Sequence, residues 1–227
     1  MVNSPCAQRL RRTLWAMALL CYLAGIPASG QAPLPHATRI TVSAARPHSF
    51  EQDTLNIRIF RWVNDHHTPV LDRLFSAYVY LGSGWVLIPV VLFAWWRRRR
   101  LLSPLLIAVS VETILVTALK QIYQQPRPLV QLAHVHALVH LHNASFPSGD
   151  AAMAFAIASV MLDREHWAVQ AAWLLYALLI AYERMYVGVH FPLDVTVGTL
   201  IGLLCARVTL AVMKTRMRSN AQIDGEK

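Results

Sequence analysis

Two short groups of polar residues interrupt an otherwise apolar chain, and their residue types suit phosphate chemistry. Lys120 and Arg127 are seven residues apart, which is two helical turns, so the two cations can share one helix face. The turn at residues 147–149 opens directly into an apolar run, where Ser148 adds a hydroxyl donor and Gly149 lets the backbone approach a ligand closely. Because the first N–H groups of a helix lack internal partners and favour anions, this turn can cradle a phosphate.

A third group combines an arginine with a histidine and a carboxylate. Arg184 precedes His190 by six residues, and Asp194 follows four residues later. Pro192 suits the first turn of a helix, so we expect His190 just before that helix and Asp194 inside it. A carboxylate beside an imidazole fixes its tautomer and leaves the other ring nitrogen free to attack. Taken alone, each group also fits a structural role, as an interfacial anchor, a helix cap or a capping pair.

The elements that carry these groups are predicted to cross a membrane. Of the 227 residues 56% are hydrophobic, which is too apolar for an ordinary soluble domain. A spanning helix needs about 20 largely apolar residues. We therefore expect an all-α, polytopic membrane helical bundle of six spans, or five if the first segment is a cleaved signal peptide. The expected spans are residues 10–26, 79–96, 101–122, 147–162, 167–186 and 193–213.

The rest of the chain divides into four parts. Residues 1–30 are either a retained span or a signal peptide, since a basic flank and an apolar middle precede a region of small residues. Residues 31–50 form a polar linker, residues 51–213 the membrane domain and residues 214–227 a cytoplasmic tail. Within the membrane domain, residues 51–77 are expected to form short amphipathic helices at the membrane surface or a small cap outside it.

The net charge of +9 is better explained by membrane topology than by a nucleic-acid partner. The basic residues gather between apolar runs, at 9–12, 97–100 and 214–218, a distribution typical of the cytoplasmic ends of spans. Six spans then place both termini in the cytoplasm and all three polar groups on the opposite face. The three cysteines indicate neither a zinc site nor a disulfide framework. The expected partners are the lipid bilayer and a membrane lipid, and the oligomeric state stays open.

Together the groups resemble the three ordered motifs of the type-2 phosphatidic acid phosphatase superfamily. The matching patterns are Lys120-x6-Arg127-Pro128, Pro147-Ser148-Gly149-Asp150 and Arg184-x5-His190-x3-Asp194. The resemblance covers residues 50–213. It implies a metal-independent enzyme without a cofactor, which removes phosphate from a membrane lipid phosphate or a prenyl diphosphate such as undecaprenyl diphosphate. The short, arginine-anchored chain indicates a bacterial inner membrane, and the basic clusters place the site on the periplasmic or exterior face.

The resemblance also assigns roles to single residues. It implies that His190 is the nucleophile, that it forms a phosphohistidine, and that Asp194 orients it. It implies that the phosphate is bound by Lys120, Arg127, Ser148, Gly149 and Arg184. Metal ligands are not expected at this site, so cationic side chains must stabilise the developing charge.

Two positions depart from the family pattern. Asp150 stands where the family usually has the histidine that protonates the leaving group, and Glu183 stands where it usually has serine. An aspartic acid donates a proton only when it is protonated first, whereas neighbouring lysine and arginine favour the charged carboxylate. A diphosphate leaves as a phosphate monoester, which needs less protonation than an alkoxide, so Asp150 as the catalytic acid favours diphosphate substrates. The change at Glu183 is expected to matter little.

Several alternatives stay open at the level of sequence. A lipid phosphotransferase would pass the phosphate from the phosphohistidine to another lipid, for example lipid A, instead of water. A non-catalytic lipid-phosphate binder would explain Asp150 as lost catalysis, and a vanadate-binding haloperoxidase shares the motifs but does not need six apolar spans. The loop at 123–146 holds four histidines that could be surface residues, a metal site or the missing acid: His134, His136, His140 and His142.

Overall fold

The structure is a computed structural model that describes residues 54–162 and 166–225, and all regular structure in these ranges is helical. The helices are α2 (Thr54–Asp65), α3 (Pro69–Gly82), the 3-10 turn η1 (Gly84–Val86), α4 (Leu87–Arg97), α5 (Arg99–Tyr123), α6 (Pro128–Gln131), α7 (Gly149–Met161), α8 (Trp167–Tyr186) and α9 (Pro192–Gly225). The predicted N-terminal span or signal peptide and the linker at 31–50 lie outside the described residues. The prediction of an all-α membrane bundle is confirmed.

Two helical segments in the described ranges are long and apolar enough to cross a membrane, Arg99–Gln131 and Pro192–Ser219. A third span results if α3 and the segment Gly84–Arg97 count as one, although they are bent by 61° relative to each other. The span expected at 79–96 is therefore interrupted, because Ser83 has an extended backbone that ends α3. The total of six spans stays a prediction.

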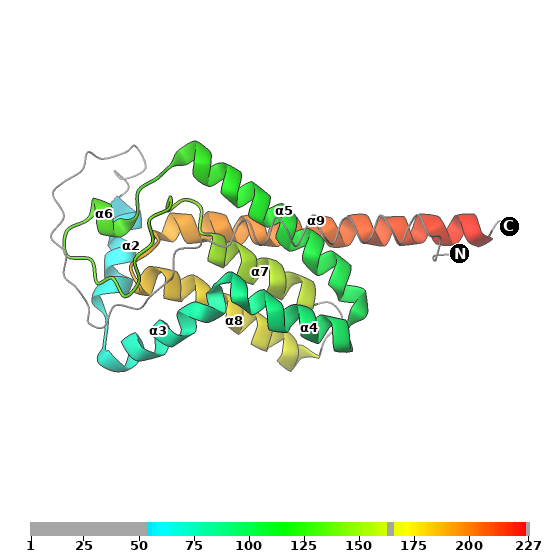
Figure 1. The fold of residues 1–227 in the computed structure, drawn as a ribbon, viewed down its shortest axis with the longest axis horizontal. Helices are drawn as coiled ribbons and strands as arrows, with labels where there is room; N and C mark the ends of the chain where they lie inside the picture. Colours follow the sequence, from blue (N-terminus) through cyan, green and yellow to red (C-terminus); the bar gives the residue numbers. More distant parts are fainter. Residues whose placement is uncertain (1–53, 163–165, 226–227) are drawn as a thin grey trace.

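Helix α7 lies at the centre of the bundle, surrounded by α5, α8 and α9 (Figure 1). Every side chain from Ala151 to Met161 is buried, so α7 has no solvent-facing side along this stretch. Such an apolar helix is typical of a buried central element. Its many alanines keep the helix thin, which lets the neighbouring helices approach its backbone.

Helix α9 makes the closest of these approaches through two glycines. A Cβ atom added at Gly198 would lie 2.3 Å from the carbonyl oxygen of Ser148, and one at Gly202 would lie 2.0 Å from that of Ala152. Only glycine permits backbones to come this close. As a consequence the two helices begin side by side, and the Ser148 N–H donates to the carbonyl oxygen of Asp194 at 3.0 Å.

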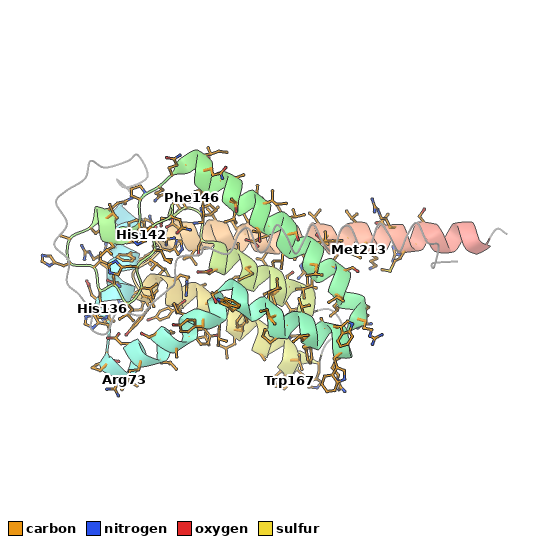
Figure 2. The ribbon with its side chains drawn as sticks, viewed as in Figure 1. Arg73, His136, His142, Phe146, Trp167 and Met213 are labelled. Atoms are coloured by element: carbon orange, nitrogen blue, oxygen red, sulfur yellow. The ribbon has the colours of Figure 1, made fainter. Side chains whose placement is uncertain are left out.

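A looser contact, between a glycine of α3 and side chains of α8, joins these two helices. A Cβ atom at the buried Gly82 would lie 3.3 Å from the Ile180 side chain and 3.4 Å from Arg184 Nη2. Helix α2, helix α6 and the long loop after α6 gather at one end of the bundle, where Figure 2 labels His136 and His142. Helix α9 projects beyond the other end and continues past Met213 (Figures 1 and 2).

We expect Gly202→Ala to destabilise the bundle. The added methyl group overlaps the carbonyl oxygen of Ala152, and overpacking of this kind costs about 1–3 kcal/mol. Thermal unfolding of the purified protein in detergent, followed by circular dichroism, measures the effect. Leu200→Ala on the same helix is the control, because that side chain is 59% exposed. An unchanged midpoint for Gly202→Ala would show that α7 and α9 are not held at this distance.

Candidate active site

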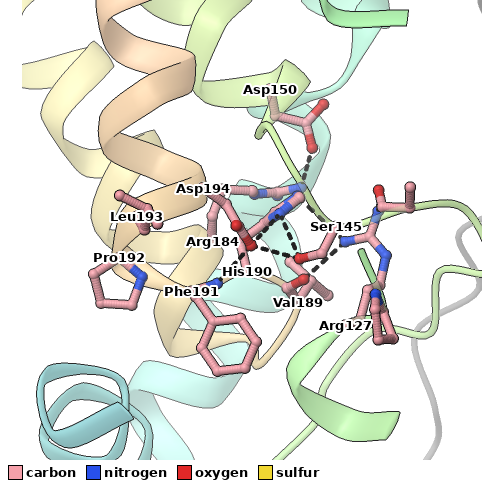
Figure 3. A network of polar contacts seen from close by, with 12 residues as sticks. Arg127, Ser145, Asp150, Arg184, Val189, His190, Phe191, Pro192, Leu193 and Asp194 are labelled. Atoms are coloured by element: carbon pink, nitrogen blue, oxygen red, sulfur yellow. Dashed lines mark hydrogen bonds and ion pairs between the residues drawn. The ribbon is translucent and has the colours of Figure 1, made fainter. Parts of the chain in front are cut away.

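The three sequence motifs meet at the end of the bundle where α5 and α8 finish and α7 and α9 begin. Figure 3 shows Arg127, Asp150, Arg184, His190 and Asp194 pointing toward one another from these elements and their loops. Most of these side chains are buried, although they are charged or polar. Such groups must be paired in an apolar surrounding, and their pairing defines the geometry of the site.

Lys120 and Arg127 reach the site by different routes. Helix α5 ends at Tyr123, and the next residue, Gln124, has a left-handed backbone with φ 44°. The expectation that both cations share one helix face is therefore wrong. The two prolines at 126 and 128 prevent the helix from continuing, so Arg127 lies in the loop. Both side chains still meet on residues 143–145, where Lys120 Nζ donates to the Ala144 oxygen at 2.6 Å.

The guanidinium of Arg127 decides the tautomer of His190. Arg127 Nε donates to the Asn143 oxygen at 2.9 Å and Nη2 donates to Asn143 Oδ1 at 2.6 Å. Nη1 donates to the Val189 oxygen at 2.8 Å and lies 3.2 Å from His190 Nε2. Because a guanidinium can only donate, His190 Nε2 accepts, and the ring proton is on Nδ1. The lone pair of Nε2 therefore faces the cationic side of the site.

The opposite nitrogen of His190 faces a serine and a carboxylate. His190 Nδ1 lies 3.6 Å from Asp194 Oδ2 and 3.4 Å from Ser145 Oγ. Ser145 Oγ donates to the same carboxylate oxygen at 2.5 Å, and the Phe191 N–H donates to it at 2.9 Å. The predicted placement of Asp194 one turn after His190 agrees with the structure. Ser145 was not predicted, and the only signal for it is its place just before the turn at 147–149.

The charge state of His190 follows from its surroundings. Burial lowers the pKa of His190 well below its usual range, and the nearby Arg127, Lys120 and Arg184 cations lower it further. The imidazole is therefore neutral at neutral pH. A neutral ring with its proton on Nδ1 and a lone pair on Nε2 is the form that can act as a nucleophile.

Ser148 and Gly149 begin α7 beside this ring. Ser148 is fully buried, and its Oγ has no hydrogen-bond partner within residues 54–162 and 166–225. The Ser148 N–H donates to the carbonyl oxygen of Asp194 at 3.0 Å. Gly149 is the first residue of α7. The positive end of the α7 dipole and an unpaired hydroxyl thus face the same space, a combination that suits an anion.

The two residues that depart from the family pattern, Asp150 and Glu183, both pair with Arg184. This arginine is completely buried. Its Nη1 pairs with Asp150 Oδ2 (Figure 3). Its Nε donates to Glu183 Oε2 at 2.5 Å, and its Nη2 donates to the Val79 oxygen at 3.4 Å. Glu183 is fully buried as well. The expectation that the change at Glu183 matters little stays a prediction, and the structure shows Glu183 as one of two carboxylates that pair with Arg184.

Comparison with known proteins identifies the family. The model of the PAP2 superfamily matches residues 101–218, which is more than half of the chain and includes all three motifs. The chain belongs to the PAP2 superfamily. It is an integral membrane phosphatase, and PAP2 phosphatases are metal-independent. The sequence-level alternative of a non-catalytic lipid-phosphate binder is therefore set aside.

Two curated relatives of this PAP2 phosphatase are undecaprenyl-diphosphatases. BcrC of Bacillus subtilis (strain 168) is 31% identical over 166 residues, which are 67% of this chain and 83% of BcrC. The undecaprenyl-diphosphatase of Sulfolobus acidocaldarius is 29% identical over 167 residues, which are 70% of this chain and 79% of that protein.

Two solved structures resemble the PAP2 phosphatase in three dimensions. The crystal structure of Aquifex aeolicus LpxE has a TM-score of 0.70 and 48% identity, covering 71% of this chain and 98% of LpxE. A transmembrane PAP2-type phosphatidylglycerolphosphate phosphatase from Bacillus subtilis has a TM-score of 0.62. At 21% identity, over 89% of this chain and 95% of that one, the second likeness shows the fold alone.

We expect Ser145→Ala to lower kcat roughly 10- to 100-fold, because a hydrogen bond to a charged group is worth about 1.5–3 kcal/mol. The change removes the hydrogen bond from Ser145 Oγ to the Asp194 carboxylate, which faces His190 Nδ1. KM is expected to change little, because Ser145 lies on the Nδ1 side of the ring and the proposed phosphate site on the Nε2 side. Steady-state phosphate release measures both constants. Ser159→Ala is the matched control, since Ser159 is also buried and its Oγ has no partner in the described parts of the chain.

A fall in kcat of the same size for both serine variants would contradict a specific role for Ser145. A rise in KM at unchanged kcat would contradict its placement behind the ring.

Proposed function

We propose that this PAP2 phosphatase hydrolyses undecaprenyl diphosphate or a closely related prenyl diphosphate through a phosphohistidine on His190. The observation that carries the proposal is the neutral imidazole whose Nε2 faces Arg127 while Nδ1 is backed by Ser145 and Asp194. The curated relatives that are undecaprenyl-diphosphatases support the choice of lipid.

The phosphate-binding residues in this proposal are Lys120, Arg127, Ser148, Gly149 and Arg184. The two cations of the first motif now bind carbonyl oxygens of residues 143–145 and 189, which a phosphate oxygen can replace as acceptor. The unpaired Ser148 hydroxyl and the N-terminus of α7 supply neutral donors. The arrangement spreads the charge of the transferred phosphoryl group over cations and N–H groups without a metal ion.

The reaction runs in two steps. In the first, His190 Nε2 attacks the terminal phosphorus, the bond from phosphorus to the bridging oxygen breaks, and Asp150 gives that oxygen a proton taken up from the substrate. The imidazolium that forms keeps its proton on Nδ1, where Asp194 balances the charge. In the second step water attacks the phosphohistidine, its proton returns to Asp150, and the bond from phosphorus to Nε2 breaks to release inorganic phosphate.

Asp150 can take up this proton once the substrate displaces it from Arg184. A phosphate that takes over Arg184 Nη1 leaves the Asp150 carboxylate beside an anion, which favours the protonated acid. Glu183 keeps its bond to Arg184 Nε throughout, so the buried arginine is never without a counter-charge. Asp150 therefore acts as general acid in the complex although it is an ion-pair partner in the free enzyme.

The same proposal includes the membrane arrangement. Six spans place residues 9–12, 97–100 and 214–218 in the bacterial cytoplasm, with both termini, and place the site on the periplasmic or exterior face. Residues 1–30 are the first span or a signal peptide, residues 31–50 a linker, and residues 51–213 the phosphatase domain. The gathering of the three motifs at one end of the bundle supports a site on a single face.

A panel of lipid phosphates tests the substrate. We expect purified wild-type protein to release phosphate faster from undecaprenyl diphosphate than from phosphatidic acid, phosphatidylglycerol phosphate or lipid A. His190→Ala is expected to release none, and labelled phosphate is expected to be trapped on wild type but not on this variant. Asp150→His should raise the rate on monoesters and lower it on the diphosphate, because an alkoxide needs a stronger acid than a phosphate monoester does.

Equal rates on phosphatidic acid and on the prenyl diphosphate would contradict the leaving-group argument. Labelled phosphate that appears on an added acceptor lipid, and not as inorganic phosphate, would identify a phosphotransferase instead.

We expect Asp150→Asn to bind inorganic phosphate roughly 10-fold more tightly than wild type, while its kcat falls. The amide competes more weakly than a carboxylate for Arg184 Nη1, and a charge-assisted bond is worth about 1.5–3 kcal/mol. Product inhibition constants, or calorimetry with phosphate alone, measure the change. Glu183→Gln is the matched control, because it also removes one negative charge from Arg184 but at Nε.

If phosphate bound more tightly to both variants by the same factor, the effect would come from the overall charge and not from exchange at Nη1. Unchanged binding to Asp150→Asn would show that substrate and Asp150 do not share this nitrogen.

A further inference from the structure

A second cluster of polar residues lies at the same end of the bundle but outside the phosphate site. His67 precedes α3, Asp72 lies in the first turn of α3, and His136 belongs to the loop after α6. One ligand atom from each residue can be chosen so that all three lie within 4.8 Å of one another. His136 Nε2 is 3.2 Å from Asp72 Oδ2, and the rings of His67 and His136 are stacked with centroids 3.7 Å apart.

The backbone of His136 is held in place by a buried asparagine. Asn64 is fully buried, its Oδ1 accepts the His136 N–H at 2.9 Å, and its Nδ2 donates to the His136 oxygen at 2.9 Å. The same Nδ2 donates to the Tyr186 oxygen at 2.9 Å. The backbone of His136 is therefore fixed relative to α2 and α8, without help from His67 or Asp72.

Asp72 is oriented in the same way by a second partner. The Tyr186 hydroxyl donates to Asp72 Oδ1 at 2.7 Å, which leaves Oδ2 directed at His136. Metal-binding carboxylates usually have such an outer hydrogen bond on the oxygen that does not bind the ion. Three side chains from separate parts of the chain thus converge, and the backbone of His136 and the carboxylate of Asp72 are already held by buried neighbours.

We propose that His67, Asp72 and His136 bind a Zn²⁺ ion. Two imidazole nitrogens and one carboxylate oxygen form a ligand set that Zn²⁺ takes, with water in a fourth position. The carboxylate brings one negative charge to a site with two neutral donors, and no main-chain group has to be displaced. Of the four loop histidines considered at the level of sequence, His136 is the one whose ring meets a second histidine and a carboxylate.

Binding requires one movement, which the structure allows. An ion lies in the plane of each imidazole that it binds, so the parallel rings of His67 and His136 cannot both bind it while they are stacked. His67 is exposed and is free to tilt, whereas His136 is half-buried and held by Asn64. The ion would therefore bind first to His136 and Asp72. The His67 ring would then tilt out of the stack to become the third ligand.

The position of the cluster suggests what the ion does. The His136 oxygen would lie 2.7 Å from a Cβ atom at Gly188, and the Leu138 N–H donates to the Val187 oxygen at 3.2 Å. The loop that His136 anchors therefore packs on the segment leading to His190, and farther along it carries Ser145. A bound ion would hold this loop on α3 without touching the phosphate, which is compatible with metal-independent chemistry.

Zinc binding to the full-length, tag-free protein in detergent tests the proposal directly. After treatment with a chelator, the wild type is expected to bind one equivalent of Zn²⁺ by calorimetry and to unfold at a higher temperature when Zn²⁺ is added. Asp72→Asn and His136→Ala should lose this binding, and Tyr186→Phe should weaken it about 10- to 100-fold, as removal of outer-shell partners does. Asp65→Asn and His142→Ala are the matched controls, because both side chains are exposed, and they should bind as wild type does.

Absence of stoichiometric binding to wild type overturns the proposal, and so does equal binding by wild type and the folded Asp72→Asn protein. Replacement of Zn²⁺ by Co²⁺ gives a second measurement, since a four-coordinate Co²⁺ site absorbs visible light strongly and Asp72→Asn should abolish that band. Neither measurement depends on the lipid substrate, so a failure here is separate from a failure of the proposed phosphatase reaction.

Discussion

Charges buried among apolar helices must be paired, and this constraint determines the arrangement of the whole site end of the bundle. Arg184, Glu183 and Asp194 are completely buried. Removing one partner of such a pair costs roughly 3–5 kcal/mol, because the remaining charge is left without compensation. Every helix end at the site therefore contributes either a charge or the groups that neutralise it. The close approach of α7 and α9 at two glycines is what brings the last of these ends into contact.

The pairing also explains how a rigid bundle can accept an anion. Arg127 and Lys120 donate to carbonyl and amide oxygens of residues 143–145 and to the Val189 oxygen, rather than to carboxylates. Neutral acceptors satisfy the hydrogen bonds of the cations but leave their charge uncompensated, so the positive potential of the site remains available. Burial and the nearby cations together keep the His190 ring neutral, and the Arg127 donor directs its free lone pair. The cations that are proposed to bind the phosphate thus also favour the neutral form of the proposed nucleophile.

The sequence predicted the parts of this site that are local. Hydropathy located α5, α8 and α9, and the spacing of His190 and Asp194 over one turn placed them correctly because a helix has a fixed rise. The break at Ser83 and the departure of Arg127 from α5 were not predicted, since both depend on turns that no periodicity records. Ser145 and Glu183 were missed as contacts for another reason. Ser145 contacts Asp194, a partner distant in sequence. Glu183 contacts the neighbouring Arg184 through a rotamer that depends on packing.

The two acids on Arg184 are better understood as one device than as two separate substitutions. Asp150 alone would leave Arg184 without a carboxylate whenever a phosphate displaced it, and a phosphate that departs would leave the buried cation unpaired. Glu183 removes this difficulty because its bond to Nε is independent of the exchange at Nη1. In the proposed reaction, the exchange would therefore free Asp150 alone, next to the bound anion. An aspartate in place of the usual histidine is therefore consistent with retained acid catalysis, provided that the residue before Arg184 is itself an acid.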